Sequence, residues 1–230
     1  MRLHRALLSL LVSPLTAFAQ AQVVGDEACP KYAVDIAYFA TCDGDRVARP
    51  SAASTLRVTA VAPQDVPPLK RTDSGRHVTA AEADRIRQAY PGRFALIDIR
   101  SRVEVVYAGQ PDVVDIHVPF REPVLPLQWN TASNGPKMQR NPAFVDAVKA
   151  ELARLDWPED SILLLLCRSG EMSAIAADAL TAAGLQHVFT IVDGFEGDLG
   201  ASGRRDVNGW KNAGGRWQAQ PVARLAAAGQ

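Results

Sequence analysis

The chain has 230 residues, a length that suits one domain with extensions or two small domains. Its hydrophobic fraction of 47% and charged fraction of 22% are those of an ordinary globular protein, and a sizeable core can form at this length. The 25 basic and 25 acidic residues give a formal net charge of zero, so the overall charge does not indicate a nucleic-acid partner.

The first residues predict a secretory signal peptide over 1–21. A short basic start, with Arg2, His4 and Arg5, precedes the apolar stretch "ALLSLLVSPLTAFA", which is too short to span a bilayer comfortably. Small-x-small patterns then predict cleavage after Ala19 or Ala21. The alternative is a buried or anchoring N-terminal helix. We expect a mature protein that is exported to the periplasm and that is not attached to a membrane after cleavage.

Residues 22–75 are expected to form an N-terminal extension. Its second part, 49–72, is rich in proline and predicts an extended linker or a segment that lies on the surface. Because an oxidising compartment favours pairing, we expect Cys29 and Cys42 to form a disulfide. This pairing leaves Cys167 as the odd cysteine. No His or Cys lies at ligand spacing to any of the three cysteines, so a metal site is not expected.

Between 76 and 218 apolar periodicity predicts one domain in which helices and strands alternate. Thr79 with Glu82 and Ser101 with Glu104 are typical of capping boxes at helix starts, and Asn141-Pro142 indicates a third start. The predicted strands are 94–99, 113–119, 161–166 and 187–192. A helix over 173–184 follows Cys167, "VNGWKNAGGRW" is expected to form a last turn or short helix, and the alanine-rich tail, 219–230, is expected to fray.

The alternation of strands and helices predicts an α/β fold with a mainly parallel sheet flanked by helices. The strand 161–166 is apolar on both faces, which is typical of a central parallel strand. Ligands in such sheets bind beyond the carboxyl ends of the strands. Cys167 follows directly after this central strand, so we expect it at the ligand-binding edge.

The short segment after Cys167 predicts a reactive thiol. A tight loop before a helix presents free backbone N–H groups, and these groups together with the helix dipole favour an anion. A thiol at that place is stabilised as the thiolate, with Arg168 adding positive charge and Gly170 allowing close backbone approach. The alternative is an inert cysteine that packs in the core.

Several motifs in this order resemble the rhodanese family of sulfurtransferases. "CRSGEMSAIAADALTAAG" is similar to the active-site loop and helix of that family, and "LIDIRSRVEVVYAG" resembles its Asp-x-Arg segment. "DIHVPF", "VFTIVDGFEGD" and "NGWKNAGGRW" resemble its later motifs. The resemblance covers roughly 76–218 and implies a rhodanese-like three-layer fold with a central, mainly parallel sheet.

The resemblance implies that Cys167 takes a sulfane sulfur from a donor such as thiosulfate and passes it as a persulfide to cyanide or a thiol. Asp98 and Arg100 would support the loop, and no metal or organic cofactor is implied. Partners would be a small anionic sulfur donor or a protein persulfide or thiol. Separately from the resemblance, the extension 22–72 has two open roles: to cover the mouth of the site or to dock a partner such as a periplasmic redox protein. The implied substrate-binding residues are Arg168, Ser169, Gly170, Glu171, Met172 and Ser173.

The loop departs from the family pattern at its sixth position, which often holds Arg. Here Met172 removes one positive charge, and Glu171 adds a negative charge beside it. A charge pair at a partly exposed site contributes about 0.5–1 kcal/mol, so we expect weaker binding of dianionic thiosulfate. A protein persulfide or a less charged donor becomes more plausible.

Two other functions stay open. The same loop geometry serves phosphatases and arsenate reductases, although their loops are usually one residue longer. A non-catalytic binding module of the same fold is the second alternative, which the intact Cys167 opposes and Met172 favours. We interpret His117 as a structural strand residue, because transfer from a thiolate needs no dedicated base. Trp210 and Trp217 are expected to pack against the edge of the domain.

Overall fold

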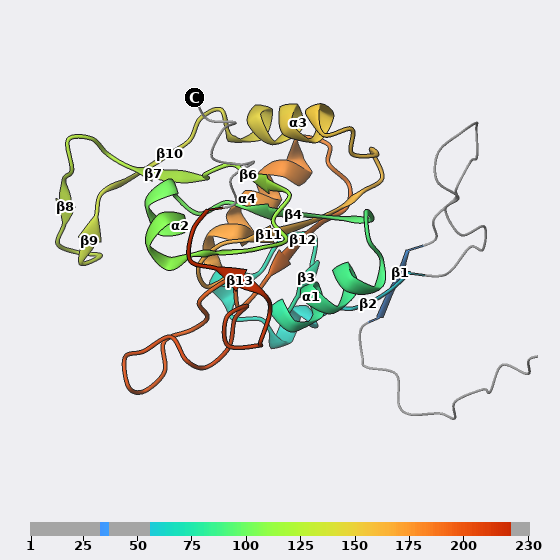
Figure 1. Cartoon of the computed structure of the whole chain (residues 1–230), viewed down its shortest axis with the longest axis horizontal. Helices are drawn as coiled ribbons and strands as arrows, with labels where there is room; N and C mark the ends of the chain where they lie inside the picture. Colours follow the sequence, from blue (N-terminus) through green and yellow to red (C-terminus); the bar gives the residue numbers. More distant parts are fainter. Residues whose placement is uncertain (1–32, 37–55, 222–230) are drawn as a thin grey trace, which may run out of the picture.

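The computed structural model describes residues 33–36 and 56–221 (Figure 1). The helices are α1 (Ala80–Ala89), α2 (Arg102–Ala108), α3 (Phe144–Arg154) and α4 (Glu171–Ala182), with the short 3-10 helices η1 (Pro63–Asp65) and η2 (Pro68–Lys70). The strands of the main sheet are β3 (His77–Val78), β4 (Phe94–Asp98), β6 (Ile116–His117), β11 (Ile162–Leu166) and β12 (Val188–Ile191). The remaining strands are β1 (Ala33–Ile36), β2 (Leu56–Thr59), β5 (Gln110–Pro111), β7 (Arg121–Pro123), β8 (Trp129–Asn130), β9 (Gly135–Pro136), β10 (Met138–Arg140) and β13 (Trp217–Gln218).

The five strands of the main sheet lie in the order β3-β12-β11-β4-β6, and every neighbouring pair is parallel. This arrangement confirms the predicted α/β fold with a central parallel sheet. The strand β11 is the middle strand, and all five of its residues are buried. The continuous apolar run "ILLLL" therefore marks the centre of the sheet, as the lack of alternation predicts.

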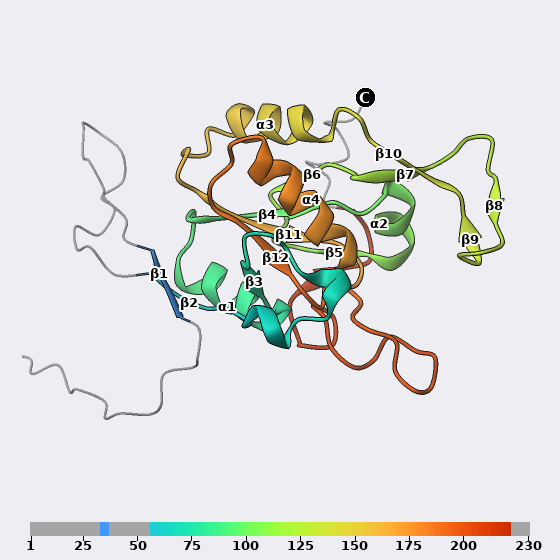
Figure 2. The ribbon, with the colours of Figure 1, turned by 180° about the vertical axis from the view of Figure 1, so that it is seen from behind.

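Helices cover both faces of the sheet, which gives three layers (Figures 1 and 2). On one face Leu164 of β11 packs in a cluster with Ile86 of α1 and Trp210. On the opposite face Leu165 packs in a cluster with Val148 of α3 and Leu180 of α4. Successive residues of β11 alternate between the two clusters because side chains of a strand point to opposite faces.

Two of the predicted helix starts have the expected caps. Ser101 and Glu104 form a complete capping box at the start of α2. At α1 the Thr79 side chain accepts from the N–H of Glu82, but the Glu82 carboxylate accepts from the N–H of Thr59 instead of closing the box. Glu82 therefore joins β2 to α1, a long-range contact that local spacing does not reveal.

The predictions for the starts of α3 and α4 were each wrong by about two residues. Asn141 does not cap α3; its side chain accepts from the N–H of Ala143 and donates to the carbonyl of Pro119, and α3 begins at Phe144. The helix α4 begins at Glu171 rather than near Ser173. Its N-terminal flanking residue, Gly170, is left-handed, and the turn made there lets the helix start at once.

The stretch 121–140, in which the sequence shows little pattern, forms a projecting β-arm. Here β7 pairs with β10 and β8 pairs with β9, both antiparallel. Figures 1 and 2 show this segment, here called the arm, extending well away from the sheet and its helices. Most residues of the arm are exposed and none is fully buried, so burial imposes no hydrophobic pattern over its whole length.

The proline-rich segment 56–75 packs against the domain through part of its length. Val58 is buried in the same cluster as Ile86, and Val66 is also buried. The buried ammonium of Lys70 pairs with Asp198 at 2.6 Å. The strand β2 pairs with β1 of the preceding extension. The division of the chain at residue 76 stays a prediction.

The predicted signal peptide 1–21, the predicted Cys29–Cys42 disulfide and most of the predicted tail 219–230 lie outside the described residues. Among the helices of the described ranges, none has the length and apolar character that a membrane crossing requires.

Candidate active site

Cys167 lies at the carboxyl end of β11, where the central strand gives way to the turn before α4. Its side chain is 4% exposed and borders the cluster beneath α3 and α4. The sulfur also has polar neighbours: the N–H of Gly170 donates to Sγ at 3.1 Å, and the hydroxyl of Ser173 lies 3.6 Å from Sγ. The thiol therefore sits at the boundary between the core and a polar turn.

The turn is tight because Gly170 has φ of +98° and ψ of −21°. A Cβ at this position would overlap the carbonyl oxygen of Val192, so only glycine fits. This conformation directs the Gly170 N–H at Sγ. The Gly170 carbonyl in turn accepts from the Ser173 hydroxyl at 2.9 Å, and this hydrogen bond ties the turn to the start of α4.

The other loop residues differ in exposure. Arg168 and Glu171 are exposed, and Ser169 is half-buried. Met172 is half-buried and packs against the cluster that contains Cys167. Of the predicted substrate-binding residues 168–173, the structure places Gly170 and Ser173 against Sγ and Met172 in the cluster that contains Cys167. At the start of α4 the first backbone N–H groups lack partners within the helix, as at any helix N-terminus.

A second loop, residues 192–197 and here called the supporting loop, packs against the cysteine turn. The site predicted from the sequence did not include it. The carbonyl of Cys167 accepts from the N–H of Phe195, and the carbonyl of Arg168 accepts from the N–H of Glu196. Gly194 has φ of +61°, and a Cβ there would lie 2.6 Å from the Cys167 carbonyl oxygen. The signal was present in "VFTIVDGFEGD", one of the motifs that resemble the rhodanese family, but none of its residues was among the predicted site residues.

Asp98 and Arg100 form a fully buried ion pair behind the site. The guanidinium donates to both carboxylate oxygens of Asp98, at 3.0 and 2.6 Å, and to the carbonyl of Gly109 at 2.9 Å. Burial alone would raise the pKa of Asp98, but the charge and hydrogen bonds of Arg100 outweigh it and hold the pKa below its usual value. The carboxylate is therefore ionised, and the pair is a rigid support for the end of β4.

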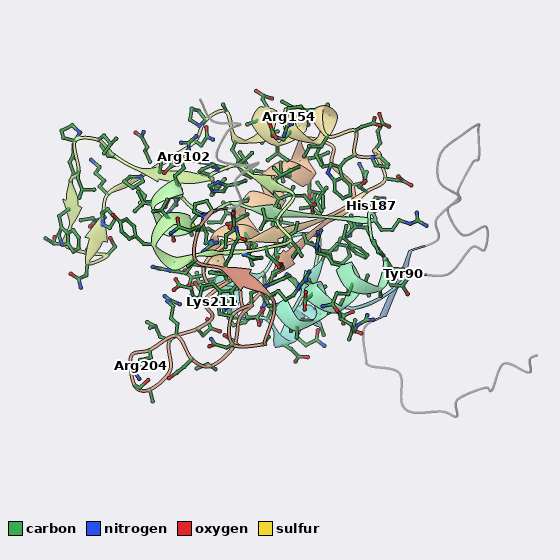
Figure 3. The ribbon with its side chains drawn as sticks, in the orientation of Figure 1. Tyr90, Arg102, Arg154, His187, Arg204 and Lys211 are labelled. Carbon is green, nitrogen blue, oxygen red and sulfur yellow. The ribbon has the colours of Figure 1, made fainter. Side chains whose placement is uncertain are left out.

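Arg100 connects this pair to the supporting loop. Its guanidinium lies 4.1 Å from the ring centroid of Phe195, and its backbone carbonyl accepts from Nε2 of His117 at 2.9 Å. Phe195 meets Trp217 edge-on, and the ammonium of Lys211 lies 4.1 Å from the Trp217 ring centroid. Figure 3 shows Lys211 beside β13. Trp217 thus packs at the domain edge, whereas Trp210 is completely buried.

Asp193 holds the supporting loop to the rest of the domain. Its carboxylate accepts from the N–H of Ala80, at the start of α1, and from the N–H of Gly209. Burial raises the pKa of Asp193 despite these hydrogen bonds. Within the described ranges, no group of three or more His, Cys, Asp or Glu side chains is arranged to hold a metal ion.

Comparisons with known proteins give relatives without a stated activity. No family model matches the chain. The chain is 32% identical over 123 residues to "Uncharacterized protein RC0915" of Rickettsia conorii, a match that covers 54% of this chain and 81% of the relative. The match to "Uncharacterized protein RP600 homolog" of Rickettsia rickettsii has the same identity and coverage.

Two solved structures are also similar. One is described as the crystal structure of Rv0390 from M. tuberculosis, with 28% identity, a TM-score of 0.46 and coverage of 62% of this chain and 96% of that one. The other is the solution structure of a polysulfide-sulfur transferase homodimer from Wolinella succinogenes, with 15% identity and a TM-score of 0.37, covering 64% of this chain and 81% of that one.

Proposed function

Because the chain belongs to the family of the uncharacterized rickettsial proteins, whose names state no activity, we propose its function from its own site. The proposal is a rhodanese-like sulfurtransferase that carries a sulfane sulfur as a persulfide on Cys167. The observation that carries it is the setting of that thiol. Sγ lies at the carboxyl end of the central strand and accepts the N–H of Gly170 in a turn that only glycine can make.

The surroundings of Cys167 suit a cysteine sulfur that forms a bond to a second sulfur atom and later breaks it. The N–H of Gly170 donates to Sγ, and such a hydrogen bond stabilises negative charge on sulfur. The Ser173 hydroxyl donates to the Gly170 carbonyl and so holds the turn in place. The start of the twelve-residue helix α4 adds a favourable dipole. The motif resemblance over 76–218 points to the same chemistry for the same cysteine.

The proposed reaction has two displacements. In the first, the Cys167 thiolate attacks the sulfane sulfur of the donor; with thiosulfate the S–S bond breaks, and sulfite leaves with the electron pair. In the second, an acceptor thiolate or cyanide attacks the outer sulfur of the persulfide. The bond between the two sulfurs breaks, and Cys167 returns as the thiolate. Neither step changes the total number of electrons, so no external oxidant or reductant is required.

The residues around the loop favour a donor of low charge. Met172 places a thioether where a guanidinium would attract a dianion, and the exposed Glu171 adds a negative charge. Arg168 is the only basic residue of the loop. We therefore propose a persulfide, carried by a protein or a small thiol, as the preferred donor, and thiosulfate as a weaker one.

One observation favours the non-catalytic alternative: Cys167 is only 4% exposed. Slow labelling of the thiol would not separate the two functions, because burial slows a bulky reagent in either case. Turnover with a small donor separates them. The phosphatase and arsenate reductase alternatives have no specific observation in their favour.

The compartment is also a proposal. The N-terminal pattern of residues 1–21 supports export to the periplasm, and an oxidising compartment would suit the proposed Cys29–Cys42 disulfide. In that compartment we propose a periplasmic redox protein as a partner, with a thiol of that protein accepting the outer sulfur of the Cys167 persulfide.

The test is turnover with thiosulfate as donor and cyanide as acceptor. We expect thiocyanate production that is weak, that saturates with thiosulfate and that disappears in Cys167→Ser. Faster turnover is expected when a small persulfide replaces thiosulfate. No thiocyanate from either donor would refute the proposed function, and unchanged turnover in Cys167→Ser would place the chemistry elsewhere.

A further inference from the structure

We propose that the arm, residues 121–140, docks an acidic protein that exchanges sulfur with Cys167. This inference rests on the proposed sulfurtransferase function and names the class of partner that serves the same site. Three observations carry it: the place where the arm leaves the sheet, the apolar side chains it exposes and its charge.

The arm begins next to the cysteine strand. The N–H of Ile99 donates to the carbonyl of Leu166, the residue before Cys167, at 2.9 Å, and the N–H of Phe120 donates to the carbonyl of Ile99 at 2.9 Å. The arm starts at the following residue. Two steps between hydrogen-bonded strands place its base roughly 10 Å from the backbone of β11. A protein whose contact surface reaches the base of the arm therefore lies near the strand that leads to Cys167.

The arm exposes large apolar side chains. Leu125, Leu127 and Trp129 are 81%, 65% and 61% exposed. The neighbouring helix α2 adds Tyr107, which is 86% exposed. Three large exposed apolar side chains within residues 125–129 of a projecting segment are typical of an interaction surface.

The charge of the arm selects the partner. It contains the basic residues Arg121, Lys137 and Arg140 and one acidic residue, Glu122, a net charge of +2 in a chain whose net charge is zero. Glu122 is paired with Arg102 of α2, the residue labelled near the base of the arm in Figure 3. In the described part of the chain no ion pair involves the Arg121 or Lys137 side chain, and both are exposed.

These positive charges favour an acidic partner over a second copy of this chain. Two copies that pair through their arms would bring like charges together, which opposes association. An acidic surface with apolar residues would satisfy both features of the arm. A hollow of about 260 Å³ at its base, lined in part by Arg102 and Arg140, offers room for an anchoring side chain of that partner.

The test compares two acceptors of the Cys167 persulfide. Wild-type protein is loaded with a small persulfide or thiosulfate, and transfer is measured to cyanide and to a single-cysteine peptide of about fifteen residues, a length that reaches roughly 50 Å when extended. The peptide carries Glu and Leu around its cysteine. A second peptide has Lys in place of each Glu.

Two arm variants remove one feature each: Arg121→Glu/Lys137→Glu reverses the charge, and Leu127→Ser/Trp129→Ser removes apolar surface. Arg204→Glu and Leu69→Ser, on η2, are the controls, since both residues are exposed and lie outside the arm. We expect the peptide-to-cyanide rate ratio to fall about three- to tenfold in each arm variant, which is the scale of rim-charge effects on association. The controls should keep the wild-type ratio.

The wild-type protein should also prefer the Glu peptide to the Lys peptide, and the charge variant should reverse that order. A ratio that stays at the wild-type value in both arm variants would overturn the docking inference while leaving the sulfurtransferase proposal intact. Failure of Cys167 to accept sulfur from either donor would overturn both. Concentration-dependent dimerisation that the arm variants abolish would identify a second copy as the occupant and refute the acidic partner.

Discussion

The backbone N–H of Gly170 lies 3.1 Å from Sγ of Cys167, and Gly170 reaches this position only through a left-handed φ of +98°. The closeness of Val192 excludes any side chain at position 170. The conformation of Gly170 thus determines that a backbone N–H faces the thiol of Cys167.

Gly170→Ala should therefore abolish turnover by displacing either the turn or the 192–197 loop. The matched control is Gly184→Ala at the other end of α4, where φ is +95° but nothing lies within 4 Å of the added Cβ. Both variants incur the strain of a left-handed alanine, about 1 kcal/mol. Turnover and thermal unfolding of both variants check this. Equal turnover in the two variants would show that the contact with Val192 does not matter.

Asp98→Asn should destabilise the fold strongly. The substitution leaves the guanidinium of Arg100 buried without its counter-charge, and breaking a buried pair in this way typically costs about 3–5 kcal/mol. Urea unfolding at neutral pH measures the loss. Replacing both partners, as in Asp98→Leu/Arg100→Met, should cost less than the single change, because no unpaired charge remains. A double variant that is less stable than Asp98→Asn would contradict this explanation.

The contribution of Asp98 should also depend on pH. Its pKa is lowered in the folded protein, so the carboxylate stabilises the fold fully above the unfolded value of about 3.9 and loses that effect as pH falls through the lowered folded value. The stability difference between wild type and Asp98→Asn should therefore be constant near neutral pH and shrink in strong acid. Burial raises the pKa of Asp193, so the stability linked to its protonated form should be present at low pH and be lost as pH rises through the raised folded pKa. A difference that grows on acidification would show that the sign is wrong.

Met172→Arg should improve turnover with thiosulfate several-fold and affect a neutral persulfide donor much less. The added guanidinium would attract a dianion at a partly exposed site, an effect of about 0.5–1 kcal/mol. Ala182→Arg adds the same charge at the far, exposed end of α4 and serves as the control. The comparison of kcat/KM for the two donors checks the prediction. No gain with thiosulfate would remove Met172 as the explanation of donor preference.

The sequence predicts the sheet well because its strongest signals are local. The run 162–166 is apolar at every position, and this marks a central strand whatever surrounds it. The box of Ser101 and Glu104 likewise depends only on a three-residue spacing. The position of Cys167, directly after the carboxyl end of the strand 162–166, was also predicted correctly.

Other features depend on contacts between distant segments and are not visible in local patterns. Gly194 belongs to the support of Cys167 because the two loops meet in space. Glu82 accepts a hydrogen bond from Thr59, twenty-three residues earlier, and so leaves its capping box half-formed. The arm over 121–140 has no buried face, so its strands are not marked by a core-facing apolar pattern over their whole length. In each case the missing information is a tertiary contact or the lack of one.

The most direct test of the central claim is the intact mass of the protein after brief incubation with a sulfane-sulfur donor and removal of the excess. The account predicts a gain of the mass of one sulfur atom in the wild type, located on the peptide that contains Cys167, reversed by cyanide and absent in Cys167→Ser. An unchanged wild-type mass with every donor, or the same gain in Cys167→Ser, would contradict it.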